Sequence, residues 1–325
     1  MKLPVFYHPD YAAPIGDDHT MPIRKFGLVA EALRRDDTLA VGFREPTPIT
    51  DAQLRSAHTP DYIEAVRTGH PRGLAESQKF PWTPPLFGSV KLTAAGMLDA
   101  CRAALDPQNE HRAAAALVSG FHHAHADHGE GFCTFNGLAI AADALRDESQ
   151  AERIAVLDLD LHYGNGTASL CAARPHLANL SIYGNDYREN TPYRDVSIKR
   201  HKDGPNHRGV ALPNGADGDH LLTVLNAELP WLLTCFDGQP PDALIYQAGA
   251  DPLRDDPYSP LDLGHSDLRT RDAFVFDFAR RHGLPVAWNL AGGYTKDVSQ
   301  VVDAHVNTFR AFFETRDSSP EVAPD

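Results

Sequence analysis

The sequence predicts one α/β domain with a central, mostly parallel sheet, and three features support this fold class. Short strand-like runs alternate with helical stretches along the whole chain, which is typical of strand–helix–strand repeats. The strand-like runs are almost continuously apolar, as expected for a sheet that helices cover on both faces. Hydrophobic residues make up 42% of the 325 residues, so the chain can bury a large core.

Six strands and two clear helices are expected. The strands are placed at residues 4–7, 115–120, 153–160, 179–184, 243–249 and 285–293. The helices are placed at residues 267–283 and 300–314. The first helix is expected to begin at an N-cap, Asp267, and to end at Gly283 after a basic last turn, a pattern that satisfies both helix ends.

Composition and charge exclude several kinds of protein. A net charge of −14 leaves no basic footprint for nucleic acid. No apolar run is long enough to span a membrane and the N-terminus lacks a secretory signal, so the expected location is the cytoplasm. Four cysteines without a Cys-x-x-Cys pair argue against a disulfide framework or a cysteine-based zinc site. The stretch 315–325 is expected to be a disordered tail, and the oligomeric state is left open.

The segment VLDLDLHYGNGTA, residues 156–168, carries three polar side chains in an apolar strand. Asp158, Asp160 and His162 alternate along the chain, so an extended backbone points them to one face. A buried carboxylate is unfavourable unless it is paired, hydrogen-bonded or bound to a metal. One such aspartate is an ordinary core residue, but two carboxylates and an imidazole on one face indicate a ligand set suited to zinc.

Three further strand ends carry reactive side chains, and the carboxyl ends of parallel strands are where sites form in such sheets. His122 and His123 follow the strand at 115–120, and Asp251 and Tyr294 follow two later strands. Taken alone, each favours an ordinary interpretation: surface histidines, a turn aspartate and a core tyrosine.

Together the strand ends predict one metal site. Asp160, His162 and Asp251 are expected to supply three zinc ligands and to leave a fourth position open, as catalytic zinc requires. Asp158 is then expected to orient one histidine of the pair from behind.

The remaining groups suit amide hydrolysis. His122 and His123 are expected to handle protons near the metal. Tyr294 is expected to donate a hydrogen bond to the oxyanion of a tetrahedral intermediate.

Four segments in this order resemble the zinc-dependent histone deacetylase superfamily, which has the arginase/deacetylase fold. They are GFHHAHADHGEGFCTFNGLAIAA, VLDLDLHYGNGTA, YQAGADPLRDDP and NLAGGY, and the resemblance covers about residues 4 to 310. The stretches HTMPIRKFGLVAEAL and LSIYGNDYRENTPYR look most like its class IV-related bacterial branch. The resemblance implies a single catalytic domain at 1–314, with a three-layer α/β/α architecture and about eight strands.

The resemblance also implies roles for individual residues. Zinc would be held by Asp160, His162 and Asp251, while Tyr294 would polarise the substrate carbonyl. His122 and His123 would be the general base and acid, the first backed by Asp158 and the second by Asn165, where other branches carry aspartate. An amide stabilises an imidazolium less than a carboxylate does, so the two histidines should differ in pKa.

Two further subsites follow from the resemblance. A monovalent cation, K⁺ or another ion, is expected near Asp158, Asp160, His162, Ser181 and Ile182. A substrate tunnel is expected to be lined by Gly131, Phe132, Thr191 and Gly292.

Several positions depart from the family pattern. Tyr163 and Tyr183 replace histidines, and Ser259 replaces a glycine in a turn. Thr191 stands where an aromatic residue usually forms the second tunnel wall, which predicts a wider or more polar tunnel. The rim aspartate that grips a peptide backbone has no clear counterpart, and Glu76 is offered in its place only as a guess.

The leading functional hypothesis is a zinc-dependent amidohydrolase that removes an acetyl or related acyl group from lysine in proteins or peptides. A rival substrate class is small acylated amines such as acetylpolyamines, but the short region 70–86 favours an open, peptide-accessible site. A non-catalytic acyl-lysine binding module and a two-manganese hydrolase of the same fold are weaker alternatives. The first would lack catalytic groups that this chain has, and the second would need more carboxylates.

Overall fold

The computed structural model describes residues 1–16, 19–186, 191–192, 204 and 206–317, and within these residues eight strands form one parallel sheet. The strands are β1 Leu3–Phe6, β2 Val41–Arg44, β3 Ala113–Ala116, β4 Ile154–Asp158, β5 Leu177–Tyr183, β8 His207–Ala211, β9 Ala243–Gln247 and β10 Val286–Asn289. Their order across the sheet is β2-β1-β3-β10-β9-β4-β5-β8, and every neighbouring pair is parallel.

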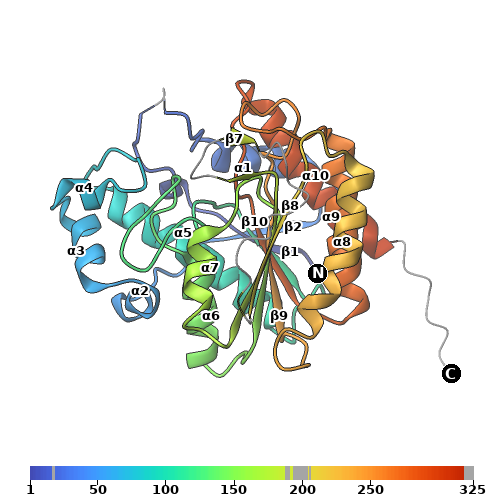
Figure 1. Ribbon diagram of the computed structural model, residues 1–325, viewed down its shortest axis with the longest axis horizontal. Helices are drawn as coiled ribbons and strands as arrows, with labels where there is room; N and C mark the ends of the chain where they lie inside the picture. Colours follow the sequence, from blue (N-terminus) through green and yellow to red (C-terminus); the bar gives the residue numbers. More distant parts are fainter. Residues whose placement is uncertain (17–18, 187–190, 193–203, 205, 318–325) are drawn as a thin grey trace.

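Helices cover both faces of this sheet, which confirms the three-layer α/β/α architecture (Figure 1). One side carries α8 Gly218–Glu228, α9 His265–Arg281 and α10 Val298–Asp317, with α1 Lys25–Arg35 packed on α10. The other carries α5 Leu86–Leu105, α6 Gly137–Asp147 and α7 Asn165–Cys171. Shorter helices lie outside this second layer: α2 Asp51–Ala57, α3 Pro60–Thr68 and α4 Arg72–Ala75.

Small irregular elements complete the described chain. They are the 3₁₀ helices η1 Pro9–Tyr11 and η2 Leu229–Leu233, and an antiparallel pair formed by β6 Asn185–Asp186 and β7 Thr191–Pro192. Among the residues that the structure describes, no helix combines the length and apolar character needed to cross a bilayer.

Burial on both faces explains why the central strands are continuously apolar. Every residue of β3, β4, β5, β9 and β10 is buried. On β10 the Trp288 ring packs edge-on against Phe276 of α9 and Phe309 of α10, with ring centroids 5.1 and 5.2 Å apart. Such aromatic contacts hold the α9–α10 layer on the sheet.

The six predicted strands are all present, but two edge strands, β2 and β8, were not expected. Both are only partly buried and contain polar residues, so neither has the apolar run that marks a central strand. The predicted N-cap of α9 is wrong. Gly264 is the N-cap, and Asp267 lies in the first turn, where its carboxylate accepts the Gly264 N–H at 2.7 Å.

The C-terminal helix extends past its predicted end. Helix α10 continues to Asp317, and residues 318–325 of the expected tail lie outside the described residues. The division into a domain at 1–314 and a disordered tail stays a prediction.

Four adjacent central strands set the position of the functional side chains. β3, β10, β9 and β4 are neighbours in the sheet, so the loops that follow their carboxyl ends open at one edge. This is the place where ligands bind in parallel sheets.

Candidate metal site and histidine pair

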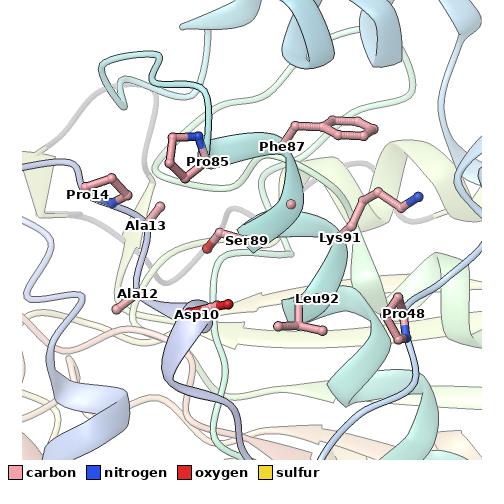
Figure 2. A pocket seen from close by; sticks show the side chains of 11 residues that line it. Asp10, Ala12, Ala13, Pro14, Pro48, Pro85, Phe87, Ser89, Lys91 and Leu92 are labelled. Carbon is pink, nitrogen blue, oxygen red and sulfur yellow. The ribbon is translucent and has the colours of Figure 1, made fainter.

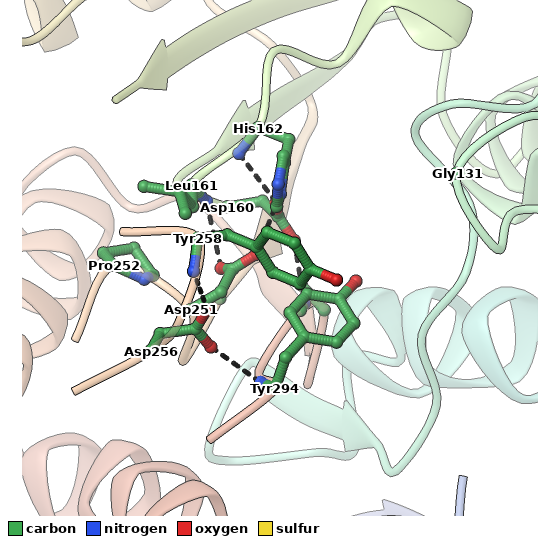
Figure 3. A network of polar contacts seen from close by, with 12 residues as sticks. Gly131, Asp160, Leu161, His162, Asp251, Pro252, Asp256, Tyr258 and Tyr294 are labelled. Carbon is green, nitrogen blue, oxygen red and sulfur yellow. Dashed lines mark hydrogen bonds and ion pairs between the residues drawn. The ribbon is translucent and has the colours of Figure 1, made fainter. Parts of the chain in front are cut away.

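The side chains predicted from four strand ends meet at this edge of the sheet. His122 and His123 follow β3 and have ring centroids 3.9 Å apart. The His162 ring beyond β4 lies 5.9 Å from that of His123 and 6.2 Å from that of Tyr294, which follows β10. Asp251, which follows β9, contacts His162 (Figure 3).

Asp160, His162 and Asp251 form a buried cluster of possible metal ligands. One ligand atom from each lies within 4.8 Å of the others. Nδ1 of His162 is 3.2 Å from Oδ1 of Asp160 and 3.1 Å from Oδ2 of Asp251. The second oxygens of the two carboxylates are held by backbone donors, since Leu161 N–H donates to Asp251 and Gly292 N–H donates to Asp160, at 3.0 and 2.7 Å.

The charge of this cluster favours the binding of a cation. Burial alone would lower the pKa of His162, but the two carboxylates outweigh it and raise that pKa to about 10. Burial, followed by repulsion from Asp160, raises the pKa of Asp251 to about 7. Two buried carboxylates facing one imidazole thus carry excess negative charge that a divalent cation would neutralise.

The space around the cluster also suits an ion. A Cβ atom at Gly292 would lie 2.0 Å from Oδ2 of Asp251 and 2.7 Å from Oδ2 of Asp160, so only glycine leaves the carboxylates in place. Two carboxylates and one imidazole are a donor set that fits zinc and leaves coordination positions for other ligands.

His122 is paired with a buried carboxylate. Its Nδ1 lies 2.8 Å from Oδ2 of Asp158, whose other oxygen accepts hydrogen bonds from Gln247 Nε2 at 3.0 Å and from the Asp160 N–H at 3.2 Å. Burial favours the neutral imidazole, but the carboxylates of Asp158 and Asp160 outweigh it and raise the pKa of His122.

His123 is paired with an amide instead. Its Nδ1 lies 2.7 Å from Oδ1 of Asn165, the first residue of α7. Burial, with added repulsion from the positive charges that His122 and His162 can carry, lowers the pKa of His123 well below its usual value. The two adjacent histidines therefore prefer different protonation states, as the exchange of carboxylate for amide predicts.

Tyr294 is held in a turn that closes the site. Its backbone N–H donates to Oδ2 of Asp256 at 2.7 Å, and its ring lies edge-on to that of Tyr258, with centroids 5.5 Å apart. Burial raises the pKa of its hydroxyl well above the usual value, so the group is a protonated donor at neutral pH. Ala291, at the start of this turn, has a φ of +51°.

A profile of the histone deacetylase domain matches residues 19–309. The chain belongs to the histone deacetylase family. This deacetylase-family protein is 32% identical over 313 residues to an uncharacterized protein of Picosynechococcus, covering 96% of this chain and 98% of the other. It is 33% identical over 177 residues to acetylpolyamine amidohydrolase 1 of Pseudomonas aeruginosa, covering 53% of this chain and 48% of that protein.

The fold of this deacetylase-family protein is shared with a solved structure. Acetylpolyamine aminohydrolase from Burkholderia pseudomallei superposes with a TM-score of 0.76 at 22% identity, over 96% of this chain and 98% of that one. The resemblance seen in the sequence is thereby confirmed for family and fold. Placement in a class IV-related branch stays a prediction.

The residues predicted for a monovalent-cation site lie together in this family member. Ser181 is the β5 partner of Asp158 in the sheet, and its hydroxyl accepts the Gly164 N–H at 3.2 Å. Ile182 is the next residue of β5 and is buried. A cation at this position stays a prediction.

Three of the four predicted tunnel residues border the site. The Phe132 ring centroid is 6.0 Å from that of Tyr294, and a Cβ at Gly131 would lie 2.4 Å from Cδ2 of His123. Gly292 borders the two metal-site carboxylates. The side chain of Thr191 lies outside the described residues, so its effect on the tunnel stays a prediction.

The other departures from the deacetylase pattern have local partners. The Tyr163 hydroxyl lies 2.6 Å from Nε2 of His207, and its ring packs 5.1 Å from that of Tyr183. The Ser259 hydroxyl donates to the Pro252 carbonyl at 3.1 Å and so completes the turn after Asp251 without glycine. Glu76, the proposed rim acid, accepts the Trp82 N–H within its own loop at 2.7 Å.

Four residues that support the site were not predicted. Gln247 holds Asp158, and Asp256 holds the backbone of Tyr294. Arg271 of α9 is fully buried, and its Nη1 donates to the Gly249 carbonyl at 2.8 Å just before Asp251. Lys25 of α1 is buried behind the Tyr294 turn. Of these four, only Gln247 could have been predicted from the sequence, because it is a polar residue at the end of an apolar strand.

A separate open pocket of about 610 Å³ lies between the 10–14 segment and α5 (Figure 2). Its lining is mostly proline, alanine and apolar residues, and its Lys91 is paired with Asp51 at 3.0 Å. Because no residue of the metal cluster or the histidine pair lines this pocket, it is not part of the candidate site.

Proposed function

We propose that this protein is a zinc-dependent deacylase that removes an acetyl or related acyl group from the ε-amine of lysine in proteins or peptides. One observation carries the proposal. Asp160, His162 and Asp251, the paired His122 and His123, and Tyr294 all converge at one edge of the sheet. Metal ligands, proton carriers and an oxyanion donor are the parts that metal-assisted amide hydrolysis needs.

The metal would be held by Asp160, His162 and Asp251. An ion bound there supplies Lewis-acid polarisation of the amide carbonyl and lowers the pKa of a water molecule. Asp158 keeps a negative charge behind His122, which lets that imidazole carry a proton. We also propose K⁺ or another monovalent cation beside Asp158 and Ser181, where it would offset this buried charge.

Protons move through the histidine pair. One imidazole takes the proton of the attacking water as its oxygen bonds to the carbonyl carbon. The Tyr294 hydroxyl donates a hydrogen bond to the developing oxyanion. When the C–N bond breaks, a histidine donates a proton to the leaving nitrogen, and a carboxylate and a free amine are released.

The rival substrate class is small acylated amines. The similarity to an acetylpolyamine amidohydrolase favours it, whereas the net charge of −14 suits either cationic product and does not discriminate. The short connection that contains α4 favours peptide access instead, because it adds no large element next to the site. A non-catalytic acyl-lysine binder would have no use for Tyr294 and the histidine pair together. A two-manganese hydrolase needs ligands for a second ion, whereas the described part of the chain holds a single candidate cluster.

A substrate panel tests this proposal. Zinc-loaded protein is incubated with acetyl-, trifluoroacetyl- and longer acyl-lysine peptides and with acetylated polyamines, beside Tyr294→Phe and His123→Ala. Turnover of peptides that both substitutions abolish supports a lysine deacylase and identifies its acyl preference. Turnover of polyamines alone moves the protein to the small-amine class. A folded, zinc-loaded protein that turns over nothing in the panel contradicts the proposal.

A further inference from the structure

Glu130 extends the hydrogen-bonded chain behind His123 beyond Asn165. The Asn165 side-chain amide donates from Nδ2 to Oε2 of Glu130 and faces Nδ1 of His123 with its oxygen. On the far side, Nε2 of His125 lies 3.5 Å from the same carboxylate oxygen. The order is thus imidazole, amide, carboxylate and a second imidazole.

A tight turn fixes Glu130 in this position. Residues 130 and 133 are joined by reciprocal backbone hydrogen bonds, with Glu130 N–H to Cys133 O at 3.2 Å and Cys133 N–H to Glu130 O at 2.8 Å. Gly131 and Phe132 inside the turn have φ values of +51° and +64°. The turn therefore lies directly against the His123 ring at Gly131 and acts on His123 indirectly at Glu130, which contacts Asn165.

The carboxylate decides which way the Asn165 amide points. An ionised carboxylate only accepts hydrogen bonds, so the NH₂ group of Asn165 must face Glu130. The amide oxygen must then face His123, and an oxygen only accepts, so Nδ1 of His123 must carry the hydrogen. In a neutral imidazole the lone pair is then on Nε2, across the ring from Asn165.

We propose that Glu130 is a positioning residue that sets the tautomer of His123 by orienting the Asn165 amide. Aspartate beside a histidine needs no such help, because both of its oxygens accept. The asparagine amide has an oxygen that accepts and an NH₂ group that donates. An NH₂ group facing Nδ1 of His123 would favour the opposite tautomer. Glu130 thus compensates for the asparagine at position 165, and its effect on turnover rests on the proposed hydrolase function.

Without Glu130 the amide loses its preferred orientation. A flipped Asn165 presents NH₂ to Nδ1 and stabilises the tautomer with hydrogen on Nε2, which can no longer accept a proton there. The fraction of molecules with a competent His123 then falls, while the substrate-binding surface at Phe132 stays the same. The expected signature is a lower kcat with little change in KM.

Kinetics of single variants test the first step. Glu130→Ala is expected to lower kcat by about tenfold or more, the size typical for groups that orient a reactive residue. Glu130→Gln keeps a carbonyl oxygen that can still accept a hydrogen bond from Asn165. Its kcat should therefore lie between those of the unaltered protein and Glu130→Ala. Asp127→Asn is the matched control, because Asp127 is an acid of the same loop with a side chain 72% exposed.

A double-variant cycle distinguishes an orienting role of Glu130 from a purely structural one. In the Asn165→Asp background the orientation problem disappears, and Glu130 then places a second carboxylate against the first. Glu130→Ala should therefore raise kcat in that background while it lowers kcat in the Asn165 protein. A loss of similar size in both backgrounds would identify Glu130 as a structural residue and overturn the proposal.

The tautomer can also be measured without substrate. Protonated and lone-pair nitrogens of a neutral imidazole have distinct ¹⁵N shifts, so long-range ¹H–¹⁵N spectra of histidine-labelled protein report the His123 tautomer directly. The hydrogen is expected on Nδ1 in the unaltered protein, whereas Glu130→Ala should be a mixture of the Nδ1–H and Nε2–H tautomers. An unchanged tautomer in Glu130→Ala overturns the inference even if the protein proves inactive on every acyl substrate, so failure here is distinct from failure of the proposed function.

Discussion

The ammonium group of Lys25 donates a 2.6 Å hydrogen bond to the carbonyl oxygen of Ala291, three residues before Tyr294. Lys25 is fully buried, and its Nζ lies 6.0 Å from the centroid of the Tyr294 ring. Burial lowers the pKa of Lys25 to about 8, partly offset by Asp251, Asp160 and Asp256. A cation on α1 therefore anchors the turn that presents Tyr294.

We expect Lys25→Met to lower kcat by about tenfold with little change in KM, because the Tyr294 turn loses this anchor. Stability should fall as well, by about 1–3 kcal/mol, because the buried Ala291 carbonyl is left without its donor. Lys296→Met is the control, because Lys296 is exposed and lies two residues after Tyr294. Unaltered kcat in Lys25→Met would contradict the anchoring role.

Asp251→Asn is expected to weaken zinc binding by at least about 100-fold, because the cluster loses one of its two negative charges while its shape is kept. Metal content after dialysis against a weak chelator measures this loss, and titration with a hydroxamate reports the remaining site. Asp255→Asn, at an exposed neighbouring position, should retain the zinc of the unaltered protein. Equal metal content in both variants would remove Asp251 from the ligand set.

Stability should fall as the pH drops from about 6.5 towards 4, in part through His58. Its Nε2 accepts the Asn136 N–H, and its Nδ1 lies against the His125 carbonyl, both at 2.9 Å. Burial lowers the pKa of His58 to about 4, whereas an unfolded histidine titrates near ~6.5. The unfolded chain binds the proton first, so this contribution is complete above about pH 6.5 and is lost below it.

Chemical denaturation at pH 7.5 and 5 measures this effect. The unaltered protein should lose about 2 kcal/mol more unfolding free energy than His58→Gln between these two pH values, because the variant has no titratable side chain at position 58. His220→Gln, at an exposed position, should keep the full pH dependence. Equal slopes for the unaltered protein and His58→Gln would exclude His58 as the cause.

Gly131→Ala is expected to lower kcat by more than tenfold. The new Cβ would lie 2.4 Å from Cδ2 of His123, and the φ of +51° disfavours any residue with a side chain. Thermal unfolding should show a loss of about 1–2 kcal/mol. Gly88→Ala, in α5 with open space at its Cβ, should be as stable as the unaltered protein or slightly more stable and fully active.

Much of the candidate site could be inferred from short segments of sequence. Side-chain direction repeats every two residues in an extended chain, so the alternation of Asp158, Asp160 and His162 predicted one polar face. The structure places Asp160 and His162 in one cluster with Asp251 and puts Asp158 behind His122. The strands were recognisable for a similar reason, since burial on both faces requires an apolar run, while the partly buried edge strand β2 lacks one.

Contacts between distant segments could be found only in the folded chain. Lys25 and Ala291 are separated by 266 positions, and the Glu130–Asn165 bond joins a loop to the start of a helix. Neither contact has a period or spacing in the sequence, because each depends on how whole elements pack. The residue types at the candidate metal site could therefore be predicted from short segments of sequence, whereas the orientation and charge of the groups behind it were decided by tertiary packing.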